Sequence, residues 1–486
     1  MLKFTIVLGG ILLVSAVFSY SHGLRNVCPS LEDYKTIYTN EKCSYNPNVG
    51  SSTGDIVQRY GYQFENHLVV TEDGYILKLH RILPPSNKTS NTIGEEKRPP
   101  VIVFHGLGGS SAFWVLQGKK SLAFFLVDNG FDVWLGNFRG NYYSNTHVRL
   151  TQQSREYWNF GFHEIAIYDL PACIDFISKT TGGKGNLAYI GHSMGTTISY
   201  VYSILRAKHA KENLRVIVSL APVAYPKNIR GLFKLLSPVA PVLADILRLK
   251  GMHAIGQFHE LFQGLMAVTC GKYPLIISCN EILSLAAGQS HVSQFQPEIL
   301  PVFLSYYPSG TSLHTLEHFA QLIVRGGQFQ MFDYGPLINV QKYNHQIPPE
   351  YDVKQIQVPV HLFVGYYDAI GTQEDAAILF SKLQGAQIET EITKHLLPYA
   401  HNDFFLAKHL EPFHEKLLDI IKYFGIFNQQ GRNLCFLYEI LKQIFCPITL
   451  INIQHVLELT AKNLYIFYLH NFRHDNLQST VSEIQN

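Results

Sequence analysis

A serine that could act as a nucleophile lies between two glycines in residues 191–195, which read Gly-His-Ser-Met-Gly. A strand that reverses tightly into a helix holds the middle residue in strained geometry, and small neighbours two positions away leave room for it. Ser193 is preceded by the short apolar run 187–190 and followed by a helical segment at 196–205. The five-residue pattern is common by chance, and a plain Gly-Ser turn is the alternative. The strand before it and the helix after it favour the nucleophile.

A serine hydroxyl needs a base to take its proton, and the base needs a carboxylate to orient it. When these groups follow successive strands of one sheet, the expected order is serine, acid, histidine. Asp368 follows the apolar run 358–364, and His401 follows a later alternating segment by a few residues. Taken singly, Asp368 could be a turn or cap residue. His395 is a second candidate base, but its place at or inside a strand end favours a structural role. We predict a catalytic triad of Ser193, Asp368 and His401.

The oxyanion that forms when a serine attacks an ester must be stabilised by hydrogen-bond donors. We predict that one donor is the backbone N–H of Met194, directly after the serine. The second is expected from the glycine-rich loop 105–108, where Leu107 offers the N–H group. An ordinary glycine-rich turn is the alternative for this loop.

Short apolar runs alternate with helical segments from about residue 68, which predicts an α/β fold with a mainly parallel central sheet covered on both faces. In such sheets the working site lies at the carboxyl ends of the strands. Residues 69–77 predict a hairpin that turns at Asp73-Gly74. Buried strands are expected at 101–104, 131–135, 187–190 and 358–364, a helix at 164–178, and a last strand around 388–392.

The segment between Ser193 and Asp368 is far longer than one strand–helix unit requires, and its pattern from 225 onward is helical with Pro- and Gly-rich breaks. We therefore expect an inserted cap. The expected organisation is a signal peptide at 1–23, the first part of the core at 24–224, a helical cap and lid at 225–350, the second part of the core at 351–427, and a C-terminal extension of unassigned role at 428–486.

The N-terminus predicts the compartment. Lys3 precedes an apolar run at 4–18 and then the small residues Ser19 and Ser21, which is typical of a secretory signal peptide. A membrane anchor is the alternative, but the run is shorter than the roughly 20 apolar residues that span a bilayer. We expect a secreted or lysosomal protein with no transmembrane segment in its mature chain. A glycosylation acceptor is expected at Asn87, in an Asn-Lys-Thr sequon.

Secretion permits disulfides, and the chain has seven cysteines. Cys173 lies in an apolar stretch and is expected to be the free, buried thiol. The sequence leaves the pairing of the other six open.

The charge composition of the chain disfavours nucleic acid as a partner. Lys and Arg number 39 and Asp and Glu 37, a formal net charge of +2. Because no basic excess exists to neutralise phosphates, a nucleic-acid partner is disfavoured. Oligomeric state does not follow from the sequence.

Several runs of the sequence resemble the acid lipase family, of the gastric and lysosomal acid lipase type. The resemblance covers roughly residues 55–425. The runs are 70–77 (VTEDGYIL), 105–107 (HGL), 132–137 (DVWLGN) with 139–140 (RG), 168–172 (YDLPA), 191–193 (GHS) and 328–335 (QFQMFDYG).

This resemblance implies an α/β-hydrolase fold with an inserted helical cap and lid. It implies hydrolysis of neutral lipid esters, triacylglycerol or cholesteryl ester, at a lipid–water interface without a metal or organic cofactor. It assigns Ser193, Asp368 and His401 as nucleophile, acid and base. It also assigns Leu107 and Met194 as oxyanion donors and Cys270 with Cys279 as a cap disulfide. Met194 replaces the Gln usual in the family, which leaves the backbone donor in place.

Three other functions remain as alternatives. A small-ester esterase or a thioesterase would use the same residues on a different substrate. A non-catalytic lipid-binding protein on the same fold would be expected to lack the nucleophile, whereas Ser193 is present.

Overall fold

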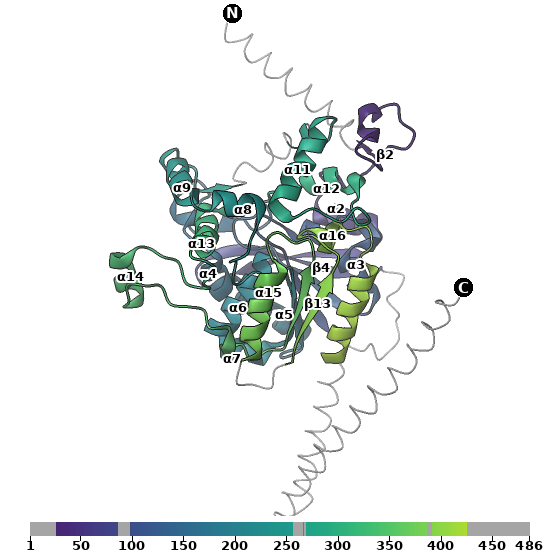
Figure 1. Cartoon of the computed structure of the whole chain (residues 1–486). Coiled ribbons are helices and arrows are strands. Elements are labelled where there is room, and N and C mark those ends of the chain that lie inside the picture. The colour runs from purple at the N-terminus through teal and green to yellow at the C-terminus, as the bar shows by residue number, and fades with distance from the viewer. Residues whose placement is uncertain (1–25, 86–97, 256–265, 267–268, 386–390, 425–486) are drawn as a thin grey trace, which may run out of the picture. The chain divides into compact units, whose positions relative to one another are not determined.

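A mostly parallel sheet runs through the protein (Figure 1). The structure is a computed structural model that describes residues 26–85, 98–255, 266, 269–385 and 391–424. Its strand order is β13-β12-β9-β8-β5-β6-β4-β3, with β7 beside β4. The strands are β3 Gln63–Val70, β4 Tyr75–Leu83, β5 Pro100–Phe104, β6 Asp132–Leu135, β7 Thr146–His147, β8 Leu187–His192, β9 Leu214–Leu220, β12 Val360–Gly365 and β13 Ile392–Leu397.

The pairing is parallel from β13 to β6 and antiparallel from β6 through β4 to β3. Strands β5, β6, β8, β9 and β12 are buried at every position. Continuous apolar runs suit strands that helices cover on both faces. The sequence predicted this α/β architecture, and it is confirmed.

Helices cover both faces of the sheet, and alternate residues of each strand face one layer or the other. Val101 and Val103 pack with α3 (Leu122–Asp128) and with a helix over 411–424. Ile102 and Phe104 face the opposite layer. That layer contains α4 Phe162–Glu164, the π-helical turn Ile165–Asp169, α5 Leu170–Thr181, α6 Met194–Leu205, α7 Ala207–Asn213 and α15 Gln373–Gln384. The short helices α2 Thr53–Arg59 and α16 Asp403–Leu406 complete this part of the fold.

A helical segment separates β9 from β12 and lies over the carboxyl ends of the strands (Figure 1). It contains α8 Gly231–Leu236, α9 Ala240–Leu249, α11 Leu275–Ala287, α12 Leu300–Leu304, α13 Leu313–Val324 and α14 Pro336–Tyr343. Strands β10 (Ala254–Ile255) and β11 (Thr311–Ser312) pair within it. Near the start of the described chain, β1 (Asn26–Val27) pairs with β2 (Ser44–Tyr45).

Several expectations from the sequence can be compared directly with the strands. The hairpin is confirmed, and Gly74 at its turn has a φ of 97°. The four predicted buried strands are present as β5, β6, β8 and β12, and the predicted helix at 164–178 lies inside a longer helical stretch. The last strand begins later than expected, at Ile392, and residues 386–390 lie outside the described residues. The sequence analysis missed β9.

The cysteines pair within the segments outside the sheet. Cys28 is bonded to Cys43, and Cys270 to Cys279, while Cys173 is free and buried. Asn87, the expected signal peptide at 1–23, the extension at 428–486 and its Cys435 and Cys446 all lie outside the described residues.

A buried ion-pair network joins three loops of the core. Arg139 is 2% exposed. Its guanidinium donates to the Asp169 carboxylate at 2.6 Å and to Asp73 at 2.6 and 2.8 Å, and it stacks on the Tyr75 ring at 3.9 Å. The network connects the hairpin turn, the loop after β6 and the π-helical turn before α5. Removing one charge would leave a buried carboxylate unpaired.

We expect Arg139→Met to lower the free energy of unfolding by about 3–5 kcal/mol, because Asp169 would stay buried without its ionic partner and would have to keep an unpaired charge or take up a proton. Urea unfolding at neutral pH measures the change. The matched control is Arg206→Met. Arg206 pairs with Glu72 at 3.6 Å, but the two side chains are 44% and 77% exposed, so the loss should stay below about 0.5 kcal/mol. Equal losses in the two variants would contradict this interpretation.

Candidate active site

Ser193 occupies a strained turn between β8, which ends at His192, and α6, which begins at Met194. Its backbone has φ 53° and ψ −117°, in a region that side chains disfavour. The flanking glycines allow this turn to pack. A Cβ on Gly191 would lie 2.8 Å from the Gly195 backbone, and one on Gly195 would lie 3.0 Å from the His105 carbonyl oxygen. The Gly-x-Ser-x-Gly spacing is therefore a packing requirement of this turn.

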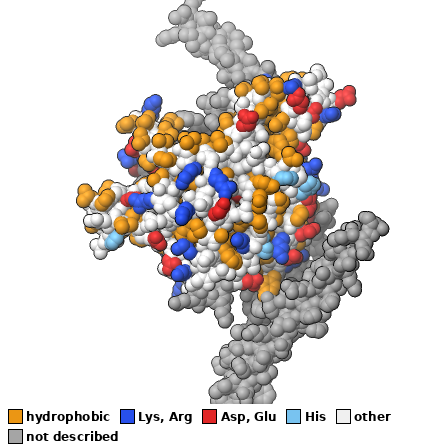
Figure 2. Space-filling view, in the orientation of Figure 1, with side chains coloured by type: hydrophobic (Ala, Val, Ile, Leu, Met, Phe, Trp, Pro, Cys, Tyr) orange, Lys and Arg blue, Asp and Glu red, His pale blue; other side chains and the backbone are white. Residues whose placement is uncertain are grey.

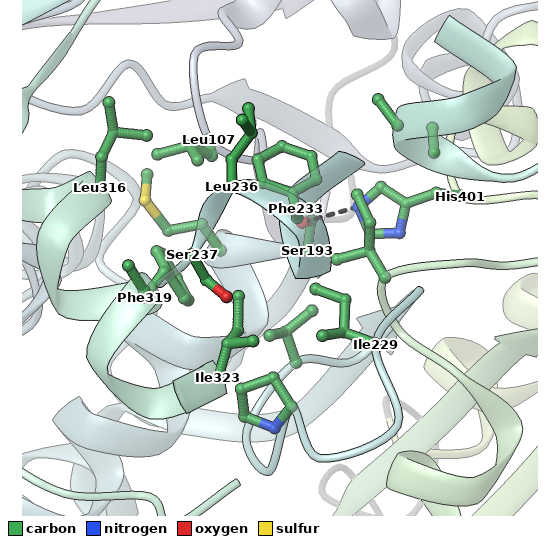
Figure 3. A pocket seen from close by; sticks show the side chains of 18 of the residues that line it. Leu107, Ser193, Ile229, Phe233, Leu236, Ser237, Leu316, Phe319, Ile323 and His401 are labelled. Carbon is green, nitrogen blue, oxygen red and sulfur yellow. Dashed lines mark hydrogen bonds between the residues drawn. The ribbon is translucent and has the colours of Figure 1, made fainter. Parts of the chain in front are cut away.

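The structure brings Ser193, His401 and Asp368 into one hydrogen-bonded chain. Figure 3 shows the hydrogen bond between Ser193 and His401. The Ser193 hydroxyl lies 2.8 Å from His401 Nε2 and donates to it when that nitrogen is unprotonated. His401 Nδ1–H donates to the two carboxylate oxygens of Asp368, at 3.0 and 2.9 Å. All three residues are buried. This is the geometry in which a histidine can deprotonate a serine.

Backbone hydrogen bonds fix the acid of this chain. Asp368 lies in the loop after β12, and its carboxylate also accepts the N–H groups of Ile370 at 2.7 Å and Gly371 at 2.8 Å. Several donors bound to one carboxylate hold it in a fixed orientation. Asp368 therefore presents a fixed acceptor to His401.

The backbone of His401 is held on both sides. Its N–H donates to the carbonyl of Ala287, the last residue of α11, at 3.1 Å. Its carbonyl accepts Nε2–H of His192 at 2.8 Å. His395, the other candidate base, lies within β13 and bonds Thr393 at 2.7 Å through Nε2. The structure thus places His401, rather than His395, beside the serine.

Two further imidazoles lie near the triad and are structural groups that the sequence analysis did not assign. The ring of His192 lies 4.8 Å from that of His401, and burial lowers the pKa of His192 well below its usual range, with His401 acting in the same direction. Burial likewise lowers the pKa of His105 to about 4. Both rings are therefore neutral in mild acid, so neither places a positive charge beside His401.

The predicted oxyanion donors lie on either side of Ser193. Leu107 is in the loop after β5, and Met194 is the first residue of α6; both line the same cavity as the serine. Among the described residues, no acceptor pairs with the backbone N–H of either. Gly106 permits the close approach, because a Cβ there would lie 2.9 Å from Ser193 Cβ. His105 fixes the loop through Nδ1–H, which donates to the Gly106 carbonyl at 2.8 Å.

Above the serine is a cavity of about 300 Å³ (Figure 3). Among the residues that the structure describes, no Asp, Glu, Lys or Arg lines it. Helices that are far from Ser193 in the sequence supply the walls of this cavity. The spacing of their apolar residues predicted that they are helices, but it did not predict which of these residues face the cavity. The apolar residues that line the cavity and are labelled in Figure 3 are Leu107, Ile229, Phe233, Leu236, Leu316, Phe319 and Ile323.

The described residues hold neither a cluster of metal ligands nor a helix that could span a membrane. In that part of the chain, no group of three or more His, Cys, Asp or Glu side chains is arranged to hold a metal ion. Within the same residues, no helix has the length and apolar character needed to cross a membrane.

Comparison with known proteins identifies the class and then the family. Residues 99–249 match the family described as alpha/beta hydrolase fold, and residues 53–118 match the partial alpha/beta-hydrolase lipase region. The protein is therefore an α/β-hydrolase. It is 38% identical to gastric triacylglycerol lipase of Mus musculus over 74% of this chain and 89% of that one. It is 36% identical to the Homo sapiens gastric triacylglycerol lipase (74% and 88% covered) and 35% identical to Homo sapiens lipase member K (75% and 88%). The chain belongs to the acid lipase family.

The strain at Ser193 has a measurable consequence for stability. Glycine adopts positive φ angles without a steric penalty, so Ser193→Gly should be more stable than Ser193→Ala by about 1 kcal/mol. Chemical unfolding of the two variants measures this difference. At Ser199, inside α6, the order should reverse, with glycine less stable than alanine by about 1 kcal/mol. Alanine as the more stable residue at position 193 would show that the turn carries no strain.

Proposed function

We propose that this protein is a lipase that hydrolyses the carboxylic ester bonds of neutral lipids through an acyl-enzyme on Ser193. The observation that carries the proposal is the chain of hydrogen bonds from Asp368 through His401 to Ser193, which ends in an uncharged, apolar cavity. The chain supplies an activated hydroxyl, and the cavity suits a long acyl chain.

In the proposed mechanism, His401 Nε2 takes the proton of Ser193, and Oγ attacks the carbonyl carbon of the ester. The backbone N–H groups of Leu107 and Met194 hold the oxyanion. The bond to the alcohol breaks, and the alcohol leaves with the proton from His401. Water then attacks the acyl-enzyme with His401 as base, which releases the fatty acid and restores Ser193. Asp368 holds His401 in the tautomer that this sequence of steps requires.

Exposed apolar side chains near the cavity support a lipid substrate over a small soluble ester. Leu235 of α8 and Leu249 of α9 are 72% and 89% exposed. Figure 2 shows hydrophobic side chains gathered over this part of the surface. Large exposed apolar patches are typical of surfaces that contact other molecules or membranes. The names of the relatives, gastric triacylglycerol lipase among them, also favour a triacylglycerol or similar neutral ester.

We further propose that residues 1–23 are a signal peptide, that Asn87 is glycosylated, and that the protein is secreted or lysosomal. The sequence pattern at 4–21 supports the first, and the family supports the last. We keep the proposed organisation into core segments at 24–224 and 351–427, a cap and lid at 225–350, and an extension at 428–486.

Replacing the nucleophile tests the activity. Ser193→Ala should lower hydrolysis of emulsified long-chain triacylglycerol and cholesteryl ester to background without unfolding the protein, because the acyl-enzyme needs Oγ. Titration of released fatty acid from acid to neutral pH measures this, with a soluble short-chain ester in parallel. Turnover of only the short ester by the wild-type protein would indicate an esterase. Undiminished activity in Ser193→Ala would overturn the assignment of Ser193.

The role of the cavity is tested by narrowing it. Ala240 of α9 lines the cavity, and Ala240→Phe should fill part of the space that a long chain needs. We expect turnover of a long-chain ester to fall about tenfold or more, while turnover of a butyrate ester stays within about twofold. The short ester is the internal control for folding and for the triad. Equal losses for both esters would mean that the acyl chain binds elsewhere.

A further inference from the structure

A second cavity, of about 270 Å³, lies on the other side of α11 from the first. Polar and apolar residues line this second cavity, the polar cavity, in about equal number, whereas the first cavity is lined mainly by apolar residues. The polar residues of the second cavity include Asn280, Ser284, Gln289, Ser290 and Asp403. The 89% exposed side chain of Val292 also lines it, so the cavity reaches the surface. A space that offers several polar groups and opens to the surface can hold water.

Three residues line both cavities and therefore form the wall between them: Leu283, Ala287 and Asn402. On α11, Asn280 and Ser284 line only the polar cavity, whereas Ala286 lines only the apolar one. The spacing of four residues between the polar side chains places them on one face of the helix. The wall is thus a single helix turn together with the residue that follows His401.

The wall is fixed to the catalytic loops. The Ala287 carbonyl accepts the His401 N–H at 3.1 Å. Gly288 lies so close to the acid loop that a Cβ there would be 2.1 Å from the Tyr367 carbonyl oxygen. The Asn402 carbonyl accepts two N–H groups from α16, while its side-chain amide has no partner among the described residues. Asn402 therefore offers a free amide at a fixed place between the cavities.

The proposed reaction needs water at this place. Once an ester has acylated Ser193, its acyl chain occupies the apolar cavity, whose uncharged walls hold water poorly. If the mouth of that cavity rests on lipid, bulk water does not reach the acyl carbonyl from that side. The polar cavity lies on the other side of the wall, where Ala400 and Asn402, the two neighbours of His401 in the chain, line it.

We propose that the polar cavity is the water site for deacylation and that Asn402 guides water from it to the acyl-enzyme. The inference rests on the proposed function. In the step, the water oxygen attacks the acyl carbon while His401 Nε2 takes one water proton. The bond from the carbonyl carbon to Ser193 Oγ then breaks, and that proton passes to Oγ. The products are a fatty acid and free Ser193. Asn402 is a positioning residue that makes this step faster than transfer to an apolar alcohol.

The test measures how the acyl group on Ser193 is partitioned between two acceptors, water and 1-hexanol. A long-chain p-nitrophenyl ester acylates the enzyme, and 1-hexanol, which enters through the apolar cavity, competes with water. The measured quantity is the ratio of hexyl ester to free fatty acid. Asn402→Leu keeps the shape of the side chain and removes its hydrogen bonds. We expect the ratio to rise about tenfold, while the burst of p-nitrophenol that reports acylation stays within about twofold.

Three further variants make the result specific. Ser284→Leu narrows the polar cavity from α11 and should raise the ratio in the same direction, which keeps the test valid if Asn402→Leu does not fold. Asn402→Ser retains a hydroxyl and should leave the ratio within about twofold of the wild type. Leu285→Ala is the control on the same helix, because Leu285 lines neither cavity.

An unchanged ratio in both Asn402→Leu and Ser284→Leu would overturn the proposal. A ratio in Asn402→Ser as high as that in Asn402→Leu would also overturn it. A purely structural role for Asn402 would slow both acceptors together and leave the ratio unaltered. Failure of the proposed function is distinct, because the wild-type protein would then release neither p-nitrophenol nor fatty acid.

Discussion

The hydrogen bonds that hold the His401 backbone are the constraint on which the rest of the site depends. His192 binds its carbonyl from the core, and Ala287 binds its N–H from the end of α11. The imidazole can reach Ser193 and Asp368 together only while this backbone stays in place. Because Ala287 belongs to the segment between β9 and β12, the covering helices are part of the catalytic geometry as well as a roof over it.

Close backbone approach is the second physical theme of the site. Gly191 lets the end of β8 approach the start of α6, Gly195 lets the serine turn pack against the end of β5 and the loop after it, and Gly288 lets the end of α11 meet the loop of Asp368. At each of these places a side chain would push apart two segments that carry site residues. The glycines therefore allow these segments to lie close together. The packing around Ser193 maintains its strained backbone.

The two cavities differ in polarity, and in the proposed reaction one binds the acyl chain while the other supplies water. The apolar cavity has no Asp, Glu, Lys or Arg among its described lining residues, so it suits an acyl chain, while the polar cavity beyond α11 offers groups that bind water. Asn402 lines both cavities and directly follows His401, which lines the apolar one. An enzyme that works on lipid must bring an apolar ester and a water molecule to the same carbonyl, and a helix with one apolar and one polar face can separate the two until they react.

The sequence alone determined the sheet, most of its strands and the identity of the predicted triad, because each depends on a local pattern: an apolar run, a glycine turn, or a polar residue just after a strand. It also predicted the loop of Leu107 for the same reason. Strand β9 was missed, although its run of Val216, Ile217 and Val218 carried a signal. Only the tertiary structure decided which helix residues face the cavities, that His192 and Ala287 hold His401, and that Cys28 pairs with Cys43. These features join residues that are distant in the sequence or whose pairing has no local signature, so only the packing of the folded chain could specify them.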